Sequence, residues 1–551
     1  MNYKENQLFL TLPAIIRQTA KEKGANPAFS TVGSDDHITY GEAVKRIDSI
    51  IYFLEQHGIQ PGDKVAILSA NMPNWSLVYF AITSMGAVAI PLLPDFSDYE
   101  LENILTHSEA KAIFVSKNHA GKLPHLHAPD LDLWFGLEDF STLNNPSAPS
   151  ITWGEQAGQN YVVQEEDLAV IIYTSGTTGN SKGVMLSHKN IVFNAWQSGL
   201  VQSISENDRF LSILPLSHTY ENTIGLILPV MYGAHIFYLS KPPSPAIMLP
   251  ALKKVRPTIM LTVPLIIEKI YKSKILPVIT KNKFTRHIYA VGFLRKGLNL
   301  LVGRKLKKTF GGKLKFFGIG GAKLNGVVEQ FLIDAKFPYA IGYGLTETSP
   351  LAAGLNPSTV RWQSTGPSIR DGQIKIHKPD PVSREGEIWV KGPHVMQGYY
   401  KNPEKTREVM SDDGWFKTGD LGIIDQDGFL YIKGRLKNLI VGSSGENIYP
   451  EEIEAIINNF NHVLESVVFQ EKGKLVALVY FNHEELKEKY QHLKEGIESY
   501  IEARKSELRQ ELLKYVNSRV NKFSKLQLIT VHQEPFKKTA THKIKRFLYT
   551  G

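Results

Sequence analysis

The fold and the chemistry of this chain are both decided by one stretch, Tyr173-Thr174-Ser175-Gly176-Thr177-Thr178-Gly179-Asn180-Ser181-Lys182-Gly183-Val184. It follows the apolar run Leu168–Tyr173, which is typical of a buried strand. Its glycines let backbone N–H groups approach an anion, its hydroxyl groups donate to phosphate oxygens, and Lys182 adds a positive charge. The register differs from a Walker A loop, because Lys182 lies between Ser181 and Gly183. The stretch therefore predicts a polyphosphate-binding loop of another type, and the alternative is an ordinary polar loop.

Strand and helix patterns alternate on the N-terminal side of this loop. A helix is predicted to end near Gln56, before a strand at 65–69, and a second helix to end near Gly86, before strands at 88–91 and 110–115. Such alternation predicts an α/β fold with a largely parallel sheet. The apolar stretch Thr223–Leu239 contains two glycines and a proline, so we expect a buried core segment there, not a membrane span.

Composition limits the classes of function. The 551 residues include no cysteine, which excludes disulfides, thiolate catalysis and cysteine-ligated zinc. The N-terminal run Leu8–Ile16 leads into lysines and arginines without a cleavage site, so we expect an amphipathic helix and a cytoplasmic protein. The net charge of +9 is concentrated in one region, because 17 lysines and arginines between Ala251 and Phe316 face a single acid, Glu268.

Within this basic region, residues 277–311 mix cations with apolar side chains. A helix of this kind lies at an anionic membrane surface in some proteins and is a solvated insertion in others. Nucleic acid is the weakest of the three alternatives, because aromatic residues that could stack on bases are sparse. We therefore expect no nucleic acid partner and keep peripheral membrane contact through 277–311 as a hypothesis.

Two glycine-rich stretches further along the chain are suited to a nucleotide. In Gly342-Tyr343-Gly344-Leu345-Thr346-Glu347 the tyrosine offers a flat face to a purine, the threonine donates to phosphate, and Glu347 is a ligand for Mg²⁺. Gly320, Gly321 and Ala322 follow a predicted strand, and small residues there let a flat ring approach closely. The alternative for either stretch is a plain turn.

Three further positions carry polar chemistry. Asp420 follows a Thr-Gly turn, and its carboxylate suits the hydroxyl groups of a ribose. Arg435 is a forked donor for ribose or phosphate. His218 follows a strand that is predicted to end at Pro215, although a lone histidine is more often structural.

In their order along the chain these motifs resemble those of the AMP-forming acyl-CoA and aryl-CoA synthetases, the adenylate-forming ANL superfamily, and most of all bacterial long-chain fatty acid–CoA ligases. The match includes Pro215-x-x-His218, Tyr343–Glu347, the structural motif Gly386–Tyr399 and the terminal segment 535–546. The chain departs from the family at His542, where glycine is usual, and at Asn222, where the long-chain branch has arginine after Glu221.

The resemblance implies a fold and a reaction. We expect a large N-terminal domain of α/β sheet subdomains with a small β-barrel-like part, residues 1–434, and a small mobile α+β domain, residues 435–551. The second domain turns about a hinge near Lys437. A carboxylic acid and ATP, with Mg²⁺, give an acyl-adenylate and pyrophosphate, and the thiol of coenzyme A then displaces AMP.

The resemblance also implies roles for single residues. Lys543, Glu347 and Lys182 are the expected catalytic residues, and Glu347 is also the metal ligand. The expected nucleotide contacts are Thr174, Ser175, Gly176, Thr177, Thr178, Gly179, Lys182, Gly321, Ala322, Gly342, Tyr343, Gly344, Thr346, Asp420, Arg435, Ser444 and Gly445. The expected contacts with the acid are His218, Tyr220, Glu221 and Gly320.

The identity of the acid rests on less. The apolar segment 220–232, Glu221 and the basic region favour a medium- to long-chain fatty acid, with an arylalkanoate as the competing substrate. A carrier protein in place of coenzyme A is an alternative acceptor. A luciferase-like oxidase finds no support in the sequence, and a non-catalytic regulator would be expected to lack Glu347 or Lys543. The oligomeric state stays open, a dimer included.

Overall fold

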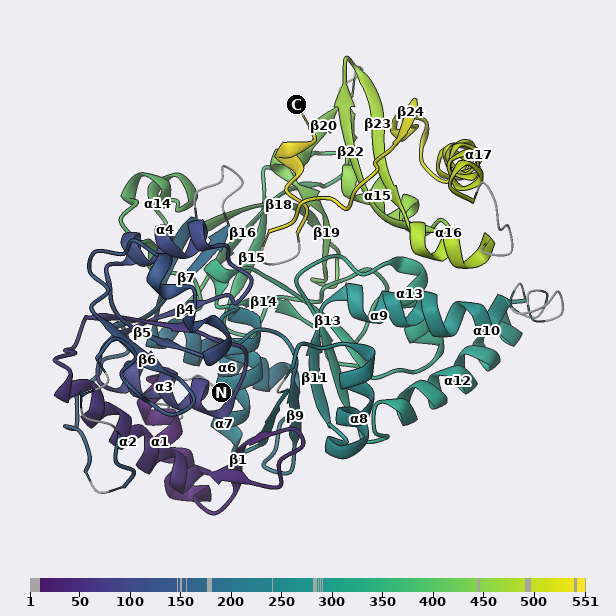
Figure 1. Cartoon of the computed structure of the whole chain (residues 1–551). Coiled ribbons are helices and arrows are strands. Elements are labelled where there is room, and N and C mark those ends of the chain that lie inside the picture. The colour runs from purple at the N-terminus through teal and green to yellow at the C-terminus, as the bar shows by residue number, and fades with distance from the viewer. Residues whose placement is uncertain are drawn as a thin grey trace.

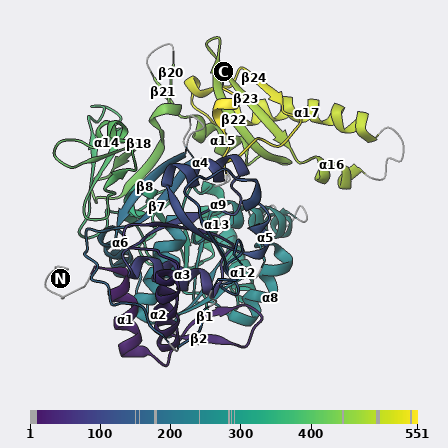
Figure 2. The same ribbon diagram turned by 60° about the vertical axis from the view of Figure 1, so that its left-hand side comes forward.

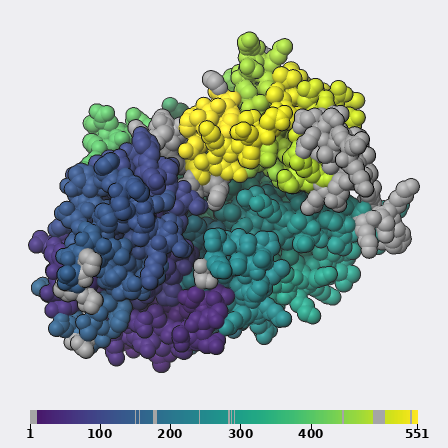
Figure 3. Space-filling model, viewed as in Figure 1, coloured from purple at the N-terminus to yellow at the C-terminus, as the bar shows by residue number. Residues whose placement is uncertain are grey.

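A computed structural model describes residues 10–550, apart from 146, 149–150, 155, 176–180, 240, 281–284, 286, 288, 290, 443–445, 491–496 and 540–542. Two large sheets and their helices form a broad body, and the C-terminal elements stand on top of it (Figure 1). Turning the molecule shows the same C-terminal part projecting above the body (Figure 2). On the surface, it lies across the junction between the early and the middle parts of the chain (Figure 3).

The first sheet contains the two strands that flank the predicted phosphate-binding loop, residues 173–184. Its spatial order is β17 (Gly398–Tyr399), β8 (Ser181–Ser187), β7 (Leu168–Ser175), β4 (Val88–Leu92), β3 (Lys64–Leu68), β5 (Ala110–Val115) and β6 (Leu133–Gly136). The strands from β7 to β6 are parallel, whereas β8 pairs antiparallel with both β7 and β17. The phosphate loop therefore connects the two strands of a hairpin.

The second sheet has eight strands. In spatial order they are β14 (Leu351–Gly354), β13 (Tyr339–Gly344), β12 (Phe316–Ile319), β11 (Ile259–Thr262), β9 (Arg209–Ser212), β10 (His235–Tyr238), β1 (Pro27–Thr31) and β2 (His37–Thr39). Only the edge pairs β13–β14 and β1–β2 are antiparallel. The carboxyl ends of the parallel strands therefore open toward one crevice, which is where such sheets bind ligands.

Helices fill the space between the sheets and cover their outer faces. The core between the sheets takes α1 (Leu12–Lys23), α2 (Tyr40–Gln56), α3 (Pro73–Ser84), α6 (His188–Val201) and α7 (Leu228–Tyr232). The other face of the eight-stranded sheet takes α8 (Pro245–Val255), α9 (Pro264–Ile270), η3 (Tyr271–Ile275), α10 (Leu276–Thr280), α12 (Gly292–Thr309) and α13 (Gly326–Asp334). The far side of the first sheet takes α4 (Asp98–Ser108), α5 (Lys117–Ala120) and η1 (Leu123–His125).

A four-stranded antiparallel sheet corresponds to the expected small β part. Its order is β15 (Gln373–His377), β16 (Gly386–Lys391), β18 (Phe416–Ile424) and β19 (Leu430–Arg435), with α14 (Pro403–Val409) beside it. After it come β20 (Ile440–Val441), β21 (Asn447–Ile448), α15 (Pro450–Ile457), β22 (Val463–Glu471), β23 (Lys474–Phe481), α16 (His483–Tyr490), α17 (Ile497–Asn517), η6 (Lys522–Ser524), β24 (Leu528–Val531) and η7 (Arg546–Leu548). Described residues between Ile440 and Ile529 share a hydrophobic core of their own. The boundary at residue 434 stays a prediction.

The α/β fold and its parallel strands agree with the sequence, with local differences. The sequence predicts a loop through Val184, whereas β8 begins at Ser181 and pairs with β7. The predicted strand before His218 ends at Ser212 instead of Pro215. The apolar stretch from Thr223 is buried as expected, in a π-helical segment η2 (Glu221–Ile227), α7 and β10. Within the described ranges, no helix is long and apolar enough to cross a membrane.

Candidate active site

The predicted metal ligand Glu347 lies in a single 3₁₀ turn, η4 (Thr346–Thr348), directly after β13. Its side chain is half-buried, and its carboxylate Oε1 accepts a hydrogen bond of 2.9 Å from the Tyr399 hydroxyl. Lys182 at the start of β8 stands over the same ring, with its Nζ 5.3 Å from the ring centre. Burial and the neighbouring Lys405 lower the pKa of Lys182, and Glu347 opposes that change. Lys182 and the Glu347 carboxylate therefore both contact Tyr399 and lie within electrostatic range of each other.

Asp420 and Arg435 are cross-strand partners on β18 and β19. The sequence predicts Asp420 just after a turn, but Thr418 and Gly419 lie within β18, and the positive φ of Gly419, +69°, bends the strand there instead. Arg435 Nε donates to one carboxylate oxygen of Asp420 and the Tyr343 hydroxyl to the other, both at 2.8 Å. Burial raises the pKa of Asp420, and Arg435 limits that rise. Each oxygen keeps a second lone pair for a ribose hydroxyl.

Lys543 reaches this group from the C-terminal segment. Burial within the cleft lowers the pKa of Lys543, Arg435 lowers it further, and Asp420 and Glu347 oppose the shift. Water still reaches the side chain, so it lies in an open cleft between charged walls. Lys543 also acts on His218, whose pKa is lowered to about 4, mainly by burial. His218 is therefore neutral at pH 7, with Nδ1 accepting from the Tyr220 amide at 3.3 Å.

Lys437 completes the cationic group. Burial lowers the pKa of Lys437, and Arg435, Lys182 and Lys543 each add to the effect, so these three cations all lie within electrostatic range of Lys437. Two carboxylates, Asp420 and Glu347, stand against them. The site therefore carries an excess of positive charge, which suits a polyphosphate.

Polar contacts hold the C-terminal part over this cleft. Asn325 Nδ2 donates to Asn459 Oδ1 at 2.6 Å, and Lys323 Nζ lies 3.6 Å from Glu452. The Tyr449 hydroxyl donates to Glu385 at 2.5 Å. The first two contacts join the C-terminal part to the segment that follows β12, and the third joins it to the residue before β16.

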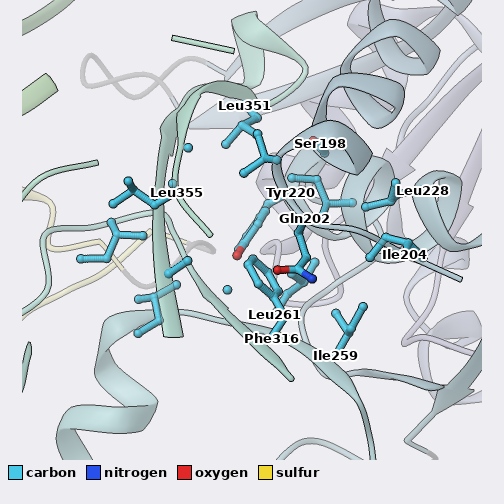
Figure 4. Close-up of a pocket in the computed structure, with 18 of the residues that line it drawn as sticks. Ser198, Gln202, Ile204, Tyr220, Leu228, Ile259, Leu261, Phe316, Leu351 and Leu355 are labelled. Carbon is cyan, nitrogen blue, oxygen red and sulfur yellow. The ribbon is translucent and has the colours of Figure 1, made fainter. Parts of the chain in front are cut away.

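An apolar cavity lies beside the cationic group, between the eight-stranded sheet and α6 with η2 (Figure 4). The strand register orders its wall in rows two residues apart. Phe210, Ile259 and Phe316 form one row, and Leu261 and Gly318 belong to the next. Large side chains therefore line the far end of the cavity, while glycines line the end near the charges.

Tyr220 lies inside this cavity with its ring near the middle (Figure 4). A Cβ atom at Gly318 would stand 3.0 Å from the Tyr220 hydroxyl, and one at Gly320 would stand 3.1 Å from its ring. Both glycines therefore allow the ring to lie directly on the β12 backbone. A ligand chain that ran from Gly320 toward Phe316 would have to displace this ring.

The residues around Glu347 suit a magnesium ion that is held largely by phosphate. Mg²⁺ in nucleotide sites is bound by one or two carboxylates together with substrate phosphates and water. Glu347 is one such carboxylate, and in the parts of the chain that the structure describes no cluster of three or more His, Asp or Glu residues could hold a metal without substrate. The donor set therefore fits Mg²⁺ that arrives with a nucleotide.

Most of the chain matches proteins that are already known. The family described as AMP-binding enzyme matches residues 16–400. Long chain acyl-CoA synthetase 6, peroxisomal, of Arabidopsis thaliana is 30% identical over 495 residues, which cover 83% of this chain and 70% of that protein. Long-chain-fatty-acid--CoA ligase FadD15 of Mycobacterium bovis is 30% identical over 456 residues, which cover 76% and 72%. The chain belongs to the AMP-binding enzyme family.

A solved structure shares the fold of this AMP-binding enzyme. O-succinylbenzoate Coenzyme A Synthetase from Bacillus subtilis, in complex with ATP and magnesium ion, matches with a TM-score of 0.75 at 23% identity. The match covers 97% of this chain and 98% of that one. The predicted fold class and the resemblance to the adenylate-forming ligases are confirmed.

The structure brings together most of the residues that the sequence selects in this AMP-binding enzyme. Thr174 and Lys182 face each other across the β7–β8 hairpin, and Ser175 pairs with Ser181. Gly321 and Ala322 lie exposed at the end of β12, and Tyr343 is 9% exposed, so little of its ring faces the cleft. Six predicted contacts lie outside the described residues: Gly176, Thr177, Thr178, Gly179, Ser444 and Gly445. Their roles, like those of the other site residues, stay predictions.

One residue at this site is not singled out by the sequence. Tyr399 belongs to the stretch 386–399, which is a strand, a turn and a strand as predicted, and which the motif marks as structural. Its contacts with both Glu347 and Lys182 depend on pairing between strands more than 200 residues apart. No local pattern in the sequence reports such a contact.

Glu221 supplies a test of the environment around the cavity. It is 1% exposed, and burial raises its pKa to about 8. An unfolded glutamate titrates near pH 4.3, so between about pH 4.3 and 8 the folded protein holds a proton that the unfolded chain releases. Wild-type stability from this group is thus lost as the pH rises through about 8. We expect Glu221→Gln, which stays neutral, to gain melting temperature relative to wild type from pH 5 to pH 9.

Thermal unfolding at several pH values measures this difference. Glu404→Gln on the exposed surface of α14 is the matched control and should show a flat difference. A flat difference for Glu221→Gln as well would contradict the buried, protonated carboxyl.

Proposed function

We propose that this enzyme activates a medium- to long-chain fatty acid with ATP to an acyl-adenylate and then transfers the acyl group to coenzyme A, releasing pyrophosphate and AMP. One observation carries the choice of acid: an apolar cavity begins beside the cationic cleft and runs along β12. Relatives named as long-chain acyl-CoA synthetases and long-chain fatty acid–CoA ligases support the same choice. The enzyme is an acid–thiol ligase.

In the first step a carboxylate oxygen of the acid attacks the α-phosphorus of ATP, and the bond to pyrophosphate breaks. Both reactants are anions, so the barrier falls when positive charge is fixed where negative charge accumulates. We assign Lys543 to the α-phosphate and the reacting carboxylate, and Lys182 to the pyrophosphate. Mg²⁺ held by Glu347 supplies further neutralisation of the phosphates. Asp420 and Arg435 are the assigned ribose contacts.

In the second step the thiol of coenzyme A attacks the carbonyl carbon of the acyl-adenylate, and AMP leaves. Lys543 occupies the cleft in the arrangement described above, so we assign that arrangement to the first step. The 435–551 domain then turns about Lys437 and withdraws Lys543 to admit the thiol. Conformational exchange of this kind lets one pocket serve two reactions.

Lys543→Ala tests the assignment of the first step. We expect adenylate formation, measured as pyrophosphate release, to fall by about 10²- to 10³-fold, because one preorganised donor to the developing charge is lost. Thioester formation from supplied acyl-adenylate and coenzyme A should stay near the wild-type rate. Lys537→Ala, which removes an exposed lysine of the same segment, is the control. Equal losses in both half-reactions would defeat the role given to Lys543.

The cavity also sets an expected chain length. From Gly320, which directly follows β12, to Phe316 the backbone spans about 13 Å at roughly 3.3 Å per residue. Once the Tyr220 ring has moved aside, this length suits an extended alkyl chain better than a single aromatic ring, with Phe316 and Ile259 as the floor. An aromatic acid remains the second candidate, since the solved structure with the same fold is an o-succinylbenzoate ligase.

Substitutions at Phe316 should move the preferred acid in opposite directions. Phe316→Ala removes the floor, and each further buried methylene is worth about 0.8 kcal/mol, so we expect the highest kcat/KM to shift to longer acids. Phe316→Trp should shift it to shorter ones. Pyrophosphate release and acyl-CoA formation are measured over saturated acids of increasing length and over aryl acids.

A general loss of stability would lower the rates for all acids together. Such a uniform loss in both variants would contradict the assignment of Phe316 to the floor of the cavity. In the same assay, turnover with coenzyme A absent and a carrier protein present would favour the carrier-loading alternative.

We further propose that α12 makes peripheral contact with an anionic membrane surface. Phe293 is 75% exposed and Leu301 is 62% exposed, on the helix face that also presents Arg304 and Lys308. Large apolar side chains surrounded by cations are typical of helices that lie at anionic lipid. The opposite face of α12, with Leu306, packs into the core, so the exposed face is available without unfolding.

The variant Phe293→Ser/Leu301→Ser tests this contact. Each apolar side chain contributes about 1.5 kcal/mol or more when buried, so we expect at least a tenfold loss of binding to vesicles that contain anionic lipid. Tyr99→Ser, which removes a 70% exposed aromatic residue from α4, is the control. Unchanged sedimentation of the double variant with anionic vesicles would exclude this face as the contact.

A further inference from the structure

Tyr399 and Met396, which precedes it by three residues, hold the side chain and the backbone of the predicted metal ligand Glu347. The Tyr399 hydroxyl donates to Glu347 Oε1 at 2.9 Å, and the backbone amide of Met396 donates to the Glu347 carbonyl oxygen at 2.9 Å. Tyr399 is only 6% exposed, so its hydroxyl has little access to solvent as an alternative partner. The connection between β16 and β17 thus fixes both the backbone and the carboxylate of Glu347.

The same side chain lies under the loop lysine. The ring face of Tyr399 is 5.3 Å from Lys182 Nζ, within the range of a cation–π interaction. The backbones are joined as well, because Tyr399 pairs with Val184 and the Tyr400 amide donates to the Gly183 carbonyl at 2.8 Å. Any displacement of Tyr399 would therefore be transmitted to the strand that carries Lys182.

The surroundings leave Tyr399 little freedom. Its amide donates to Thr406 Oγ1 at 2.9 Å, and the turn before it is held by Asn190, whose Nδ2 donates to the carbonyl oxygens of Pro393 and Val395. The side chain is therefore a preorganised donor whose geometry does not depend on a ligand. Fixed donors of this kind are what an electrostatic site requires.

Opposite charges placed this close attract, and the interior strengthens the attraction. Lys182 and Glu347 interact, yet among the ion pairs of the described residues they do not form one with each other. If they did, the lysine would lose its phosphate and the carboxylate its metal. Tyr399 disfavours such an ion pair, because its hydroxyl binds the Glu347 carboxylate while its ring contacts the Lys182 ammonium group.

We propose that Tyr399 is a positioning residue of the adenylation step, which keeps Glu347 and Lys182 from pairing and presents them separately to the metal and the pyrophosphate group of Mg·ATP. The inference rests on the roles proposed above for Glu347 and Lys182. It adds a residue from a segment that otherwise counts as structural.

Two substitutions separate the two contacts. Tyr399→Phe keeps the ring under Lys182 and removes the hydrogen bond to Glu347, whereas Tyr399→Leu removes both. A hydrogen bond to a charged group is worth about a tenfold change or more, so we expect Tyr399→Phe to raise the Mg²⁺ concentration for half-maximal pyrophosphate release about tenfold. Tyr399→Leu should in addition weaken ATP binding at saturating Mg²⁺, which Tyr399→Phe should not.

A binding measurement provides a readout that does not depend on turnover. Calorimetry with AMPCPP, an ATP analogue with a methylene group between its α- and β-phosphates, should show a weaker Mg²⁺ dependence of binding for Tyr399→Phe. Tyr400→Phe is the matched control, because Tyr400 is the next residue and its hydroxyl contacts Glu109 at 3.2 Å, away from Glu347. Thioester formation from supplied acyl-adenylate should be unchanged in both phenylalanine variants.

Two results would overturn the inference. One is a Mg²⁺ dependence for Tyr399→Phe equal to that of Tyr400→Phe, in both turnover and AMPCPP binding. The other is an equal loss in both half-reactions, which would indicate a structural role only. If the wild-type enzyme released no pyrophosphate with any carboxylic acid, the proposed function itself would fail, so the two failures are distinguishable.

Discussion

The site depends on an imbalance of charge that the fold creates and only a ligand can relieve. Lys182, the neighbouring pair Arg435 and Lys437, and Lys543 come from three separate parts of the chain and lie near the carboxylates of Asp420 and Glu347. Partial desolvation and neighbouring cations lower the pKa of both Lys437 and Lys543. A bound triphosphate would offset the repulsion between these cations. The arrangement of these charges is therefore best explained as a binding site for a polyanion.

The same imbalance gives a physical reason for the proposed rotation of the domain. Once pyrophosphate had departed, the cations would again face one another, and the lysine held by the weakest contacts would be the one to leave. Lys543 belongs to the C-terminal part, which is joined to the body by polar contacts such as the part-buried Asn325–Asn459 hydrogen bond and the Lys323–Glu452 ion pair. A solvent-exposed ion pair such as Lys323–Glu452 contributes roughly 0–1 kcal/mol. The contacts are thus weak enough for repulsion between the cations to compete with them.

The local pattern of apolar residues was enough to predict much of the fold. It failed for elements that form only by pairing with residues distant in the sequence. The strands at 65–69, 88–91 and 110–115 were readable because parallel buried strands are short apolar runs. Strand β8 was not, because Ser181–Val184 is polar and glycine-rich and becomes a strand only by pairing with β7. For the site, residue types predicted Glu347, Asp420, Arg435 and Lys543, since each lies in a motif. Tyr399 has no such mark.

The contrast between Tyr399 and Tyr343 shows that residue type and motif alone do not report the contacts of a buried tyrosine. Tyr343, between two glycines, looks suited to hold a purine, yet it is 9% exposed and its hydroxyl is committed to Asp420. Tyr399, in a motif of structural appearance, has its hydroxyl on Glu347 and its ring under Lys182. In both cases the hydroxyl holds a carboxylate that the chemistry needs in a fixed place. A buried tyrosine that donates to a functional carboxylate costs less than a second cation would, because it orients the carboxylate without neutralising its charge. The carboxylates are thus held in place for their proposed partners, the ribose and the metal, and Lys182 is kept from pairing with Glu347.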